Sequence, residues 1–365
     1  MDFSATEHPT IETELFQIAN ACFASQVDKI PGHGSPLCLL GPPGVSKTAL
    51  VRQLAEFHNM ALKVFILGST PAPDLVGFYV PDLKEGKVRH LITQDIINPE
   101  YDRDKYDGVI VLLDEFANCV EQMTTIQSTI EDWSMEGQPV NKDVFFVLAS
   151  NRPEDMSGAN EIPKSVVDRV YIHEVKPAYE QWLKWAMKNG IDYTITGYIA
   201  WKKDEALFDF DPNAPVGGQP SPRSWEKLSN LIKHLPIKSP DMIAKAAIAK
   251  VGEVKGIEYS GYARLASELC TTEEVLADPE NAAIPHHNTS ACYAMCLNLA
   301  TELAGRIEKK EDVLKEEVEA IITYFRRMDD AMAVFGFSMC VEANPAFAER
   351  SAEFTKFKQD YKGLS

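Results

Sequence analysis

Residues 41–48 read GPPGVSKT, and this stretch decides the fold of the chain. It lies between an apolar run, Leu37 to Leu40, and the start of a helical pattern, Ala49 to Phe57. Small residues let backbone N–H groups close around phosphate oxygens, and a helix that follows presents its positive N-terminal end to the anion. The stretch therefore predicts a strand, a phosphate-binding loop and a helix in succession.

The loop residues have separate expected tasks. Lys47 is expected to reach the β- and γ-phosphates of a nucleotide, and the Thr48 hydroxyl to ligate Mg²⁺. Ser46 stands where the usual pattern has its second glycine, and because serine is small, the close approach of the phosphate survives there if φ is negative. ATP with Mg²⁺ is the expected ligand pair. The predicted nucleotide-binding residues are Gly41, Pro42, Pro43, Gly44, Val45, Ser46, Lys47, Thr48 and Ala49.

Two further apolar runs end in polar side chains. Residues 109–115 read VIVLLDE, and a strand that is apolar at every position is buried on both faces, as in a parallel sheet. Asp114 is placed to hold the Mg²⁺ through its water shell, and Glu115 to polarise the attacking water as a general base. The run from Val144 to Ala149 is followed by Ser150 and Asn151, whose amide is suited to orient the water or to sense the γ-phosphate. The carboxyl ends of such strands form the ligand crevice of open α/β sheets.

The fold class follows from the order of these segments. Helical patterns fall between the apolar runs, which is the rhythm of a doubly wound parallel sheet. We expect a P-loop NTPase core with three layers, α/β/α, around a parallel five-stranded sheet. The five predicted strands are 37–40, 62–67, 109–115, 144–149 and 170–175.

The segment from Pro71 to Ile97 interrupts that rhythm. Gly77, Pro81 and Gly86 punctuate short apolar and polar alternations, which predicts a hairpin inserted in a helical connection. Phe78 and Tyr79 have two interpretations: they form an aromatic tip that grips a partner, or they pack under the hairpin.

The second half of the chain contains a linker pattern followed by helices. Residues 204–222 are acidic and rich in Pro and Gly, which is typical of a hinge or boundary. Ser221 as N-cap and Pro222 at N1 predict the start of a helix. Arg223 then lies in its first turn, where a cation is mildly unfavourable, so a nucleotide-facing role explains it better than a surface position.

From about residue 240 the pattern is helical. One seam alternates spacings of four and three residues, which predicts a long helix in a bundle or a coiled coil. Gly336 and the mixed Met and Phe content favour the bundle. The seam consists of Leu314, Val318, Ile321, Phe325, Met328, Met332, Phe335 and Met339.

Composition sets limits on the function. The chain has 365 residues and a net charge of −18, and it has no Lys/Arg block beyond short pairs, so nucleic-acid binding is disfavoured although a local basic channel stays open. No apolar stretch of about 18 residues and no signal peptide are recognised, so we expect a cytoplasmic protein without a membrane span. Among seven cysteines, Cys292 and Cys296 share a helix face and are expected to be buried free thiols. His286 and His287 are expected to be exposed, and Mg²⁺ is the only metal indicated.

These motifs together resemble the MoxR-like AAA+ ATPases and their CbbQ/NorQ-type relatives. The similar stretches are GPPGVSKT, DLVGFYVPD after the second strand, LLDEFANC, SNRPEDMSGANEIPKSVVDRV and SPRSWE, and they cover roughly residues 10–240. The helical region from about residue 250 resembles extensions of phage and prophage versions. The resemblance implies a core at 1–178 with an insert at about 71–97, a helical lid at 179–250 and a C-terminal extension at 251–365.

The resemblance also implies roles for further residues. Asn151 would be sensor 1, Arg169 the arginine finger and Arg223 sensor 2, acting in cis or in trans. Arg152 is a rival finger, but its place beside sensor 1 favours a structural or in-cis role. A finger acts across a subunit boundary, so a homo-oligomeric ring, usually of six, is implied. The 71–97 insert would line or top its pore.

Three functions are compatible with this sequence. The favoured one is an ATP-hydrolysing ring that remodels or activates a protein client, since relatives often serve a protein with a von Willebrand A domain. The alternatives are a nucleic-acid-stimulated motor or loader, and an assembly protein in which ATP cements a polymer. The C-terminal helices either bind the partner or extend the lid core.

Overall fold

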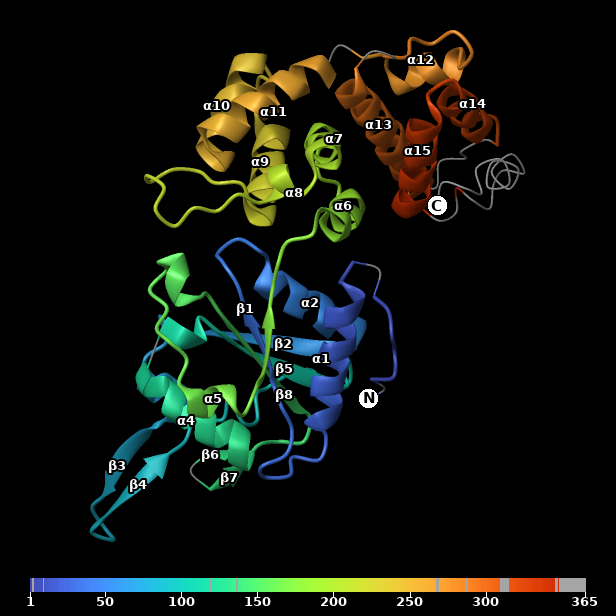
Figure 1. Ribbon diagram of the computed structural model, residues 1–365. Helices are drawn as coiled ribbons and strands as arrows, with labels where there is room; N and C mark the ends of the chain where they lie inside the picture. Colours follow the sequence, from blue (N-terminus) through green and yellow to red (C-terminus); the bar gives the residue numbers. More distant parts are fainter. Residues whose placement is uncertain are drawn as a thin grey trace. The chain divides into compact units, whose positions relative to one another are not determined.

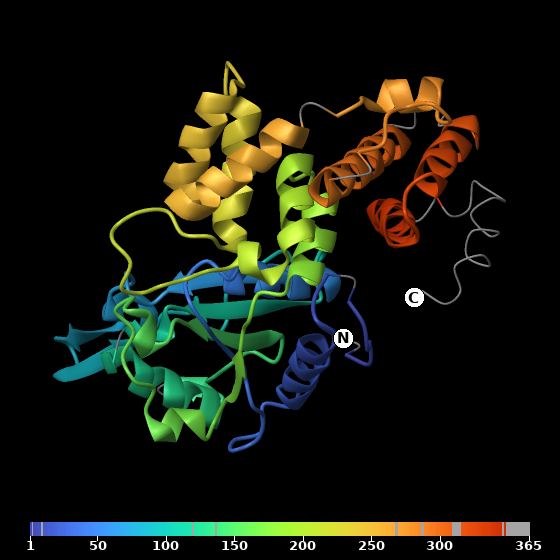
Figure 2. The ribbon, with the colours of Figure 1, turned by 45° about the horizontal axis from the view of Figure 1, so that its top comes forward.

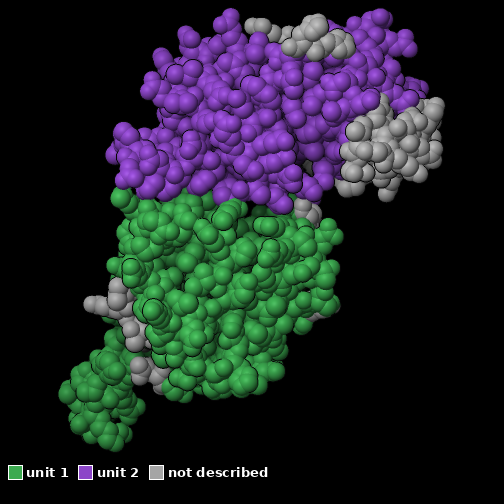
Figure 3. Space-filling model, viewed as in Figure 1, with its two compact units in different colours: residues 1–176 green, residues 177–365 purple. Residues whose placement is uncertain are grey.

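The chain divides into two compact units, residues 1–176 and 177–365 (Figure 3). The computed structural model describes residues 1, 3–8, 10–118, 120–135, 137–266, 269–285, 288–308, 315–344 and 347.

The first unit is built on five parallel strands in the order β2-β5-β8-β1-β9 (Figure 1). The two strands with the longest apolar runs, β5 and β8, lie inside the sheet and are buried almost throughout. The predicted parallel five-stranded sheet is confirmed. Its strands are β1 (Leu37–Leu40), β2 (Met60–Ile66), β5 (Gly108–Asp114), β8 (Val144–Ser150) and β9 (Tyr171–Glu174).

Helices cover both faces of this sheet. On one face, Val111 of β5 belongs to the same apolar cluster as Ile126 and Ile130 of helix α4 (Val120–Asp132). On the other face, the ring of Phe23 from α1 (Thr13–Ser25) lies 6.0 Å from that of Phe145 in β8. Helix α2 (Lys47–Phe57) contacts β2, β5 and β8. The three-layer α/β/α core is therefore confirmed.

The strand register brings the predicted polar residues to one edge of the sheet. Leu40 pairs with Ser150, and Ile66 pairs with Asp114. Because all five strands are parallel, the segments that follow these residues start from the same edge. The phosphate loop, the two carboxylates and Asn151 therefore lie next to one another at this edge of the sheet.

A two-stranded antiparallel hairpin projects from the body of the first unit (Figures 1 and 3). It follows the short helix α3, and it confirms the hairpin predicted within residues 71–97. Phe78 is 55% and Tyr79 67% exposed, and Tyr79 stacks on His90 with ring centroids 4.3 Å apart. The interpretation that both rings pack under the hairpin is therefore wrong. The elements are α3 (Ala72–Val76), β3 (Phe78–Asp82) and β4 (Lys87–Leu91).

Short elements complete the first unit around the ends of α4 and β8. They include a turn of 3₁₀ helix directly after β5 and a second one after β8. They are η1 (Phe116–Asn118), β6 (Ser134–Met135), β7 (Gln138–Pro139), η2 (Pro153–Asp155) and α5 (Lys164–Val167).

The second unit is helical (Figure 2). One apolar cluster forms around Tyr198, Trp225 and Tyr259, and another around Met295 and Phe325. The division into a lid and a C-terminal extension stays a prediction. The helices are α6 (Tyr179–Lys188), α7 (Tyr193–Lys202), α8 (Asp204–Leu207), α9 (Pro222–His234), α10 (Pro240–Val251), α11 (Glu253–Ala266), α12 (Thr272–Ala277), α13 (Thr289–Glu308), α14 (Lys315–Arg326) and α15 (Asp330–Ala343).

The acidic segment 204–222 lies inside the second unit. The chain divides after residue 176, so the expectation that this segment forms a boundary is wrong. Its first residues form α8, where Ala206 and Leu207 are buried, and the indole Nε1–H of Trp225 donates to the Ala206 carbonyl oxygen at 2.9 Å. Apolar residues within the acidic run therefore attach it to the helical core.

The predicted long helix along the 314–339 seam is wrong, because the seam is divided between α14 and α15. Asp329 starts the second of these helices. Its side chain accepts a hydrogen bond from the Met332 N–H at 3.0 Å and caps the N-terminus of α15. Val318, Phe325 and Met332 are buried in one cluster, so the bundle interpretation is confirmed. Leu314 lies outside the described residues.

The two cysteines of α13 are buried free thiols, as predicted. Burial raises the pKa of Cys292 and raises that of Cys296 further, which keeps both protonated at neutral pH. The expectation for His286 and His287 falls outside the described residues. Within the described part of the chain, no helix is long and apolar enough to cross a membrane.

Candidate functional site

The loop between β1 and α2 lies at the carboxyl ends of the strands. Its first N–H, from Gly41, donates to the Ser150 carbonyl oxygen at 3.3 Å, and Gly44 has a φ of +85°. Helix α2 begins at Lys47, and the N-cap residue Ser46 makes no side-chain capping bond. The first N–H groups of a helix have no partner within it, so they are suited to bind an anion.

The condition of a negative φ at Ser46 is not met, since its φ is +69°. The loop needs a left-handed residue immediately before the helix, and this is the position where the usual pattern has glycine. A residue with a Cβ in that conformation costs roughly 1 kcal/mol. The loop therefore keeps the glycine-like backbone although the residue is serine.

The ammonium of Lys47 is buried at the centre of the site. The residue is only 8% exposed, and its Nζ donates to the carbonyl oxygens of Gly41 at 2.6 Å and Pro42 at 3.0 Å. It also donates to Asn151 Oδ1 at 2.8 Å, which joins the loop to the end of β8. All three acceptors are neutral, so an anionic phosphate oxygen would be a stronger acceptor for this cation.

The carboxylate of Asp114 is oriented from two sides. The Thr48 hydroxyl donates to its Oδ2 at 2.8 Å, and the Glu115 N–H donates to its Oδ1 at 2.9 Å. A hydroxyl and a carboxylate are the hard oxygen ligands that Mg²⁺ prefers. The donor set at these two residues therefore fits the predicted magnesium site.

Glu115 occupies a constrained turn at the end of β5. Its φ is +55°, and its carbonyl oxygen accepts a hydrogen bond from the Asn118 N–H at 2.9 Å. The turn that follows is attached to β8, because the Ala117 N–H donates to Ser150 Oγ at 3.1 Å. Asn160 holds the same turn, with its Nδ2 donating to the Ala117 carbonyl oxygen at 2.9 Å.

The contributions of the Ser150 hydroxyl and of Asn160 were not predicted from the sequence. Ser150 carried one available signal, since it is the first polar residue after the apolar run of β8. Asn160 gave none, because its importance depends on a contact with Ala117, 43 residues earlier.

The two candidate finger arginines differ in their surroundings. Arg152 donates from Nη2 to Asp155 Oδ1 at 2.8 Å and from Nη1 to Glu174 Oε1 at 2.7 Å. These contacts are within its own unit and fit the structural role that we favoured for Arg152. Arg169 lies just after α5. Its guanidinium forms an ion pair with Glu131 of α4 and donates a hydrogen bond to the Ser165 carbonyl oxygen.

Replacement of Arg152 by alanine should destabilise the fold rather than stop catalysis. The side chain of Asp155 is only 2% exposed and would lose its cationic partner, which we expect to cost roughly 2–4 kcal/mol. Urea unfolding should show the lower midpoint, and ATP turnover per folded molecule should stay within about threefold. A thousandfold loss of turnover with unchanged stability would make Arg152 the finger.

Arg223 belongs to the second unit. It lies in the first turn of α9, which is capped as predicted: Ser221 Oγ accepts from the Ser224 N–H at 3.1 Å, and Pro222 is at N1. The side chain of Arg223 is exposed. Its role as sensor 2 stays a prediction.

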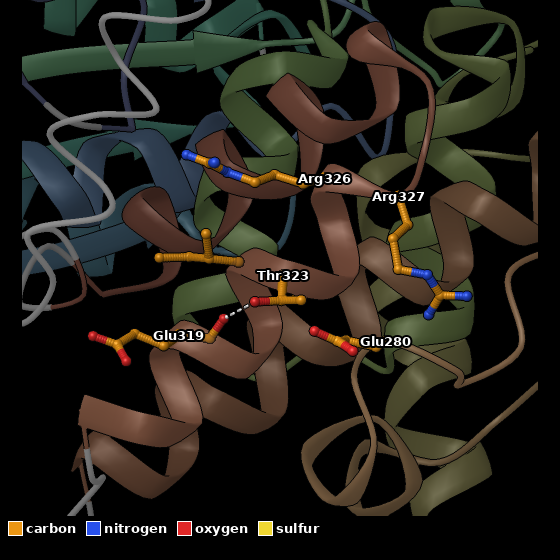
Figure 4. Close-up of a pocket in the computed structure, with 6 residues that line it drawn as sticks. Glu280, Glu319, Thr323, Arg326 and Arg327 are labelled. Carbon is orange, nitrogen blue, oxygen red and sulfur yellow. Dashed lines mark hydrogen bonds between the residues drawn. The ribbon is translucent and has the colours of Figure 1, made fainter.

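A separate cavity of about 720 Å³ lies among the C-terminal helices (Figure 4). Arg326 and Arg327 both line it, but their guanidinium groups point in different directions. Arg327 donates to the carbonyl oxygens of Pro279 at 2.7 Å and Ala282 at 2.9 Å. Two carboxylates, Glu280 and Glu319, share the wall. This mixed lining does not form a convergent site for one charged ligand.

The fold and the loop define the class of the first unit: a P-loop NTPase with a parallel five-stranded sheet. Residues 37–173 match the model of the ATPase family associated with various cellular activities, AAA. This part of the chain therefore has the P-loop NTPase fold of that family.

Two curated relatives are Lon proteases. That of Malacoplasma penetrans is 26% identical over 187 residues, which are 49% of this chain and 23% of that protein. That of Lachnoclostridium phytofermentans is 26% identical over 160 residues, which are 40% of this chain and 18% of that protein. The chain thus spans less than a quarter of the length of these relatives.

Among solved structures, a RuvB mutant from Thermotoga maritima is 15% identical to this chain. The match covers 73% of this chain and 76% of that one, with a TM-score of 0.38.

Proposed function

We propose that the chain is an ATP-hydrolysing AAA+ protein of the MoxR-like branch. It acts as a homo-oligomeric ring of six subunits that remodels or activates a protein client. The observation that carries this proposal is the meeting of three strand ends. Lys47 contacts Asn151 and Thr48 contacts Asp114, each at 2.8 Å, and Glu115 follows Asp114 directly. These are the residue types that hold, neutralise and hydrolyse a triphosphate.

Binding exchanges contacts that already exist within the site. The Lys47 ammonium turns from the carbonyl oxygens of the loop to the phosphate oxygens, while the first N–H groups of α2 bind the same anion. Thr48 and Asp114 would hold Mg²⁺, which would supply charge neutralisation. Glu115 accepts the proton of the attacking water, and Asn151 orients that water or the γ-phosphate.

The charge and the exposed apolar residues of the chain favour a protein as the client over nucleic acid. The net charge of −18 opposes a long backbone contact with nucleic acid. The projecting hairpin instead presents Phe78, Tyr79 and Val88 along its strands, each more than half exposed, and exposed apolar side chains of this kind engage protein. The motor and the ATP-cemented assembly remain the alternative functions.

Replacement of Glu115 by glutamine should abolish turnover but not ATP binding. Glutamine keeps the shape of the side chain but cannot accept the proton, and a general base is worth about 10² to 10⁴ in rate. Phosphate release should fall by that factor, while titration with a fluorescent ATP analogue should give an unchanged Kd. The matched control is Glu161→Gln, which alters an exposed carboxylate of the same unit. Normal turnover in Glu115→Gln would refute hydrolysis at this site.

The same variant tests the client. Tagged Glu115→Gln should retain a stoichiometric protein from its native cells with ATP and release it with ADP. A second variant, Glu115→Gln with Tyr79→Ala, should retain less of that protein if the hairpin forms the contact. A partner with a von Willebrand A domain would support the remodelling function, whereas nucleic acid would support the motor. ATP-dependent polymers without a partner, seen by sedimentation, would support the assembly function.

A further inference from the structure

Gly68 lies in the turn that follows the neighbouring strand β2, beside the catalytic turn. The strands β2 and β5 are in register up to Ile66 and Asp114, and the next residue, Leu67, donates its N–H to the Asp114 carbonyl oxygen at 2.9 Å. Continued by one residue, this register places Leu67 opposite Glu115, and Gly68 is the next residue, in the turn after β2. A Cβ built on Gly68 would be 2.6 Å from Glu115 Oε2.

Neither backbone conformation nor burial explains a glycine at this position. Gly77, in the same connection, has a φ of +91°, whereas the φ of Gly68 is outside the left-handed region. Gly68 is also exposed, so it is not required by a packed core. What a side chain at Gly68 would meet is the Glu115 carboxylate.

We propose that Gly68 is a positioning residue for hydrolysis, because its missing side chain leaves the space in which the Glu115 carboxylate lies. The inference rests on the proposed function, in which Glu115 is the general base. It adds a requirement in the turn after β2 to a site that otherwise comes from the ends of β1, β5 and β8.

A methyl group at Gly68 would displace the carboxylate rather than the backbone. The backbone of Glu115 is held at both ends, since its N–H donates to Asp114 Oδ1 and its carbonyl oxygen accepts from the Asn118 N–H. The Cβ of Asn118 would be 3.4 Å from the new methyl group, which is an ordinary contact. The free end of the Glu115 side chain must therefore move by several tenths of an ångström.

The test is Gly68→Ala. Because a displacement of about 1 Å at a reacting group can cost about 10²-fold in rate, we expect kcat to fall at least about tenfold. The Kd for a fluorescent ATP analogue should stay within about twofold, because Lys47, Thr48 and Asp114 are untouched. The melting temperature should not change. The matched control is Gly261→Ala in α11, where a built Cβ meets nothing within 4 Å and turnover should be unchanged.

A double variant shows whether Gly68 acts through Glu115. In the Glu115→Gln background, Gly68→Ala should cause no further loss of residual turnover, because residues that act as a unit are non-additive. An equal loss in both backgrounds would overturn the proposal, and so would normal kcat or lost ATP binding in Gly68→Ala. Normal turnover in Glu115→Gln alone would instead refute the proposed function itself.

Discussion

Replacement of Arg169 by alanine is expected to lower ATP turnover about a thousandfold while nucleotide binding is kept, since a trans arginine is commonly worth 10³ or more in rate. In the structure, the guanidinium of Arg169 forms an ion pair with Glu131 and donates to the Ser165 carbonyl oxygen of its own unit. The side chain of Arg169 is 29% exposed, so its guanidinium can exchange the Glu131 carboxylate for a phosphate bound by a neighbouring subunit. The developing charge on a γ-phosphate would compete with the Glu131 carboxylate for the same cation.

Phosphate release and fluorescent-nucleotide titration together check this expectation. The matched control is Arg103→Ala, which removes another arginine from an ion pair with a carboxylate, here Asp143 at 2.5 Å, in the same unit. Arg103 is 50% exposed and lies outside the site, so turnover should stay near that of the unaltered protein. Turnover at the normal rate in Arg169→Ala would remove the finger assignment.

The fold could be predicted because its strongest signals are local. The apolar runs of β5 and β8 are buried as their composition requires, and the polar residues directly after them lie at the same edge of the sheet. The short loop 41–46 connects a strand to a helix, so the position of Lys47 followed from the sequence alone. These features depend on neighbouring residues, which a linear pattern contains.

Features that depend on distant contacts or on special backbone conformations could not be predicted. The 314–339 seam has an uninterrupted apolar period, but the Asp329 cap divides it into two helices. Ser46 adopts a left-handed conformation that serine does not signal. The space at Gly68 is meaningful only because Glu115, 47 residues later, occupies it. A repeating apolar pattern in the sequence shows which face of a helix is apolar. It does not show where a polar residue ends that helix.

Replacement of Lys47 by alanine should abolish detectable ATP binding. Its ammonium is the buried cation of the site, and its loss would leave the Gly41 and Pro42 carbonyl oxygens and Asn151 without their shared donor. Fluorescent-nucleotide titration should show no saturation over the range that saturates the unaltered protein. The matched control is Lys63→Ala, which removes an exposed lysine of β2 and should leave binding unchanged. Binding of normal affinity in Lys47→Ala would contradict the phosphate-loop assignment.

A mixture of Lys47→Ala and Arg169→Ala subunits tests both assignments at once. Each variant should be inactive alone, for different reasons: one lacks the phosphate-binding cation and the other lacks the finger. If Arg169 acts across a subunit boundary, a Lys47→Ala subunit still offers its arginine to the intact loop of an Arg169→Ala neighbour. The mixture should then regain part of the turnover that neither variant has. If Arg169 acts within its own subunit, no mixed pair contains a complete site, and the mixture should stay inactive.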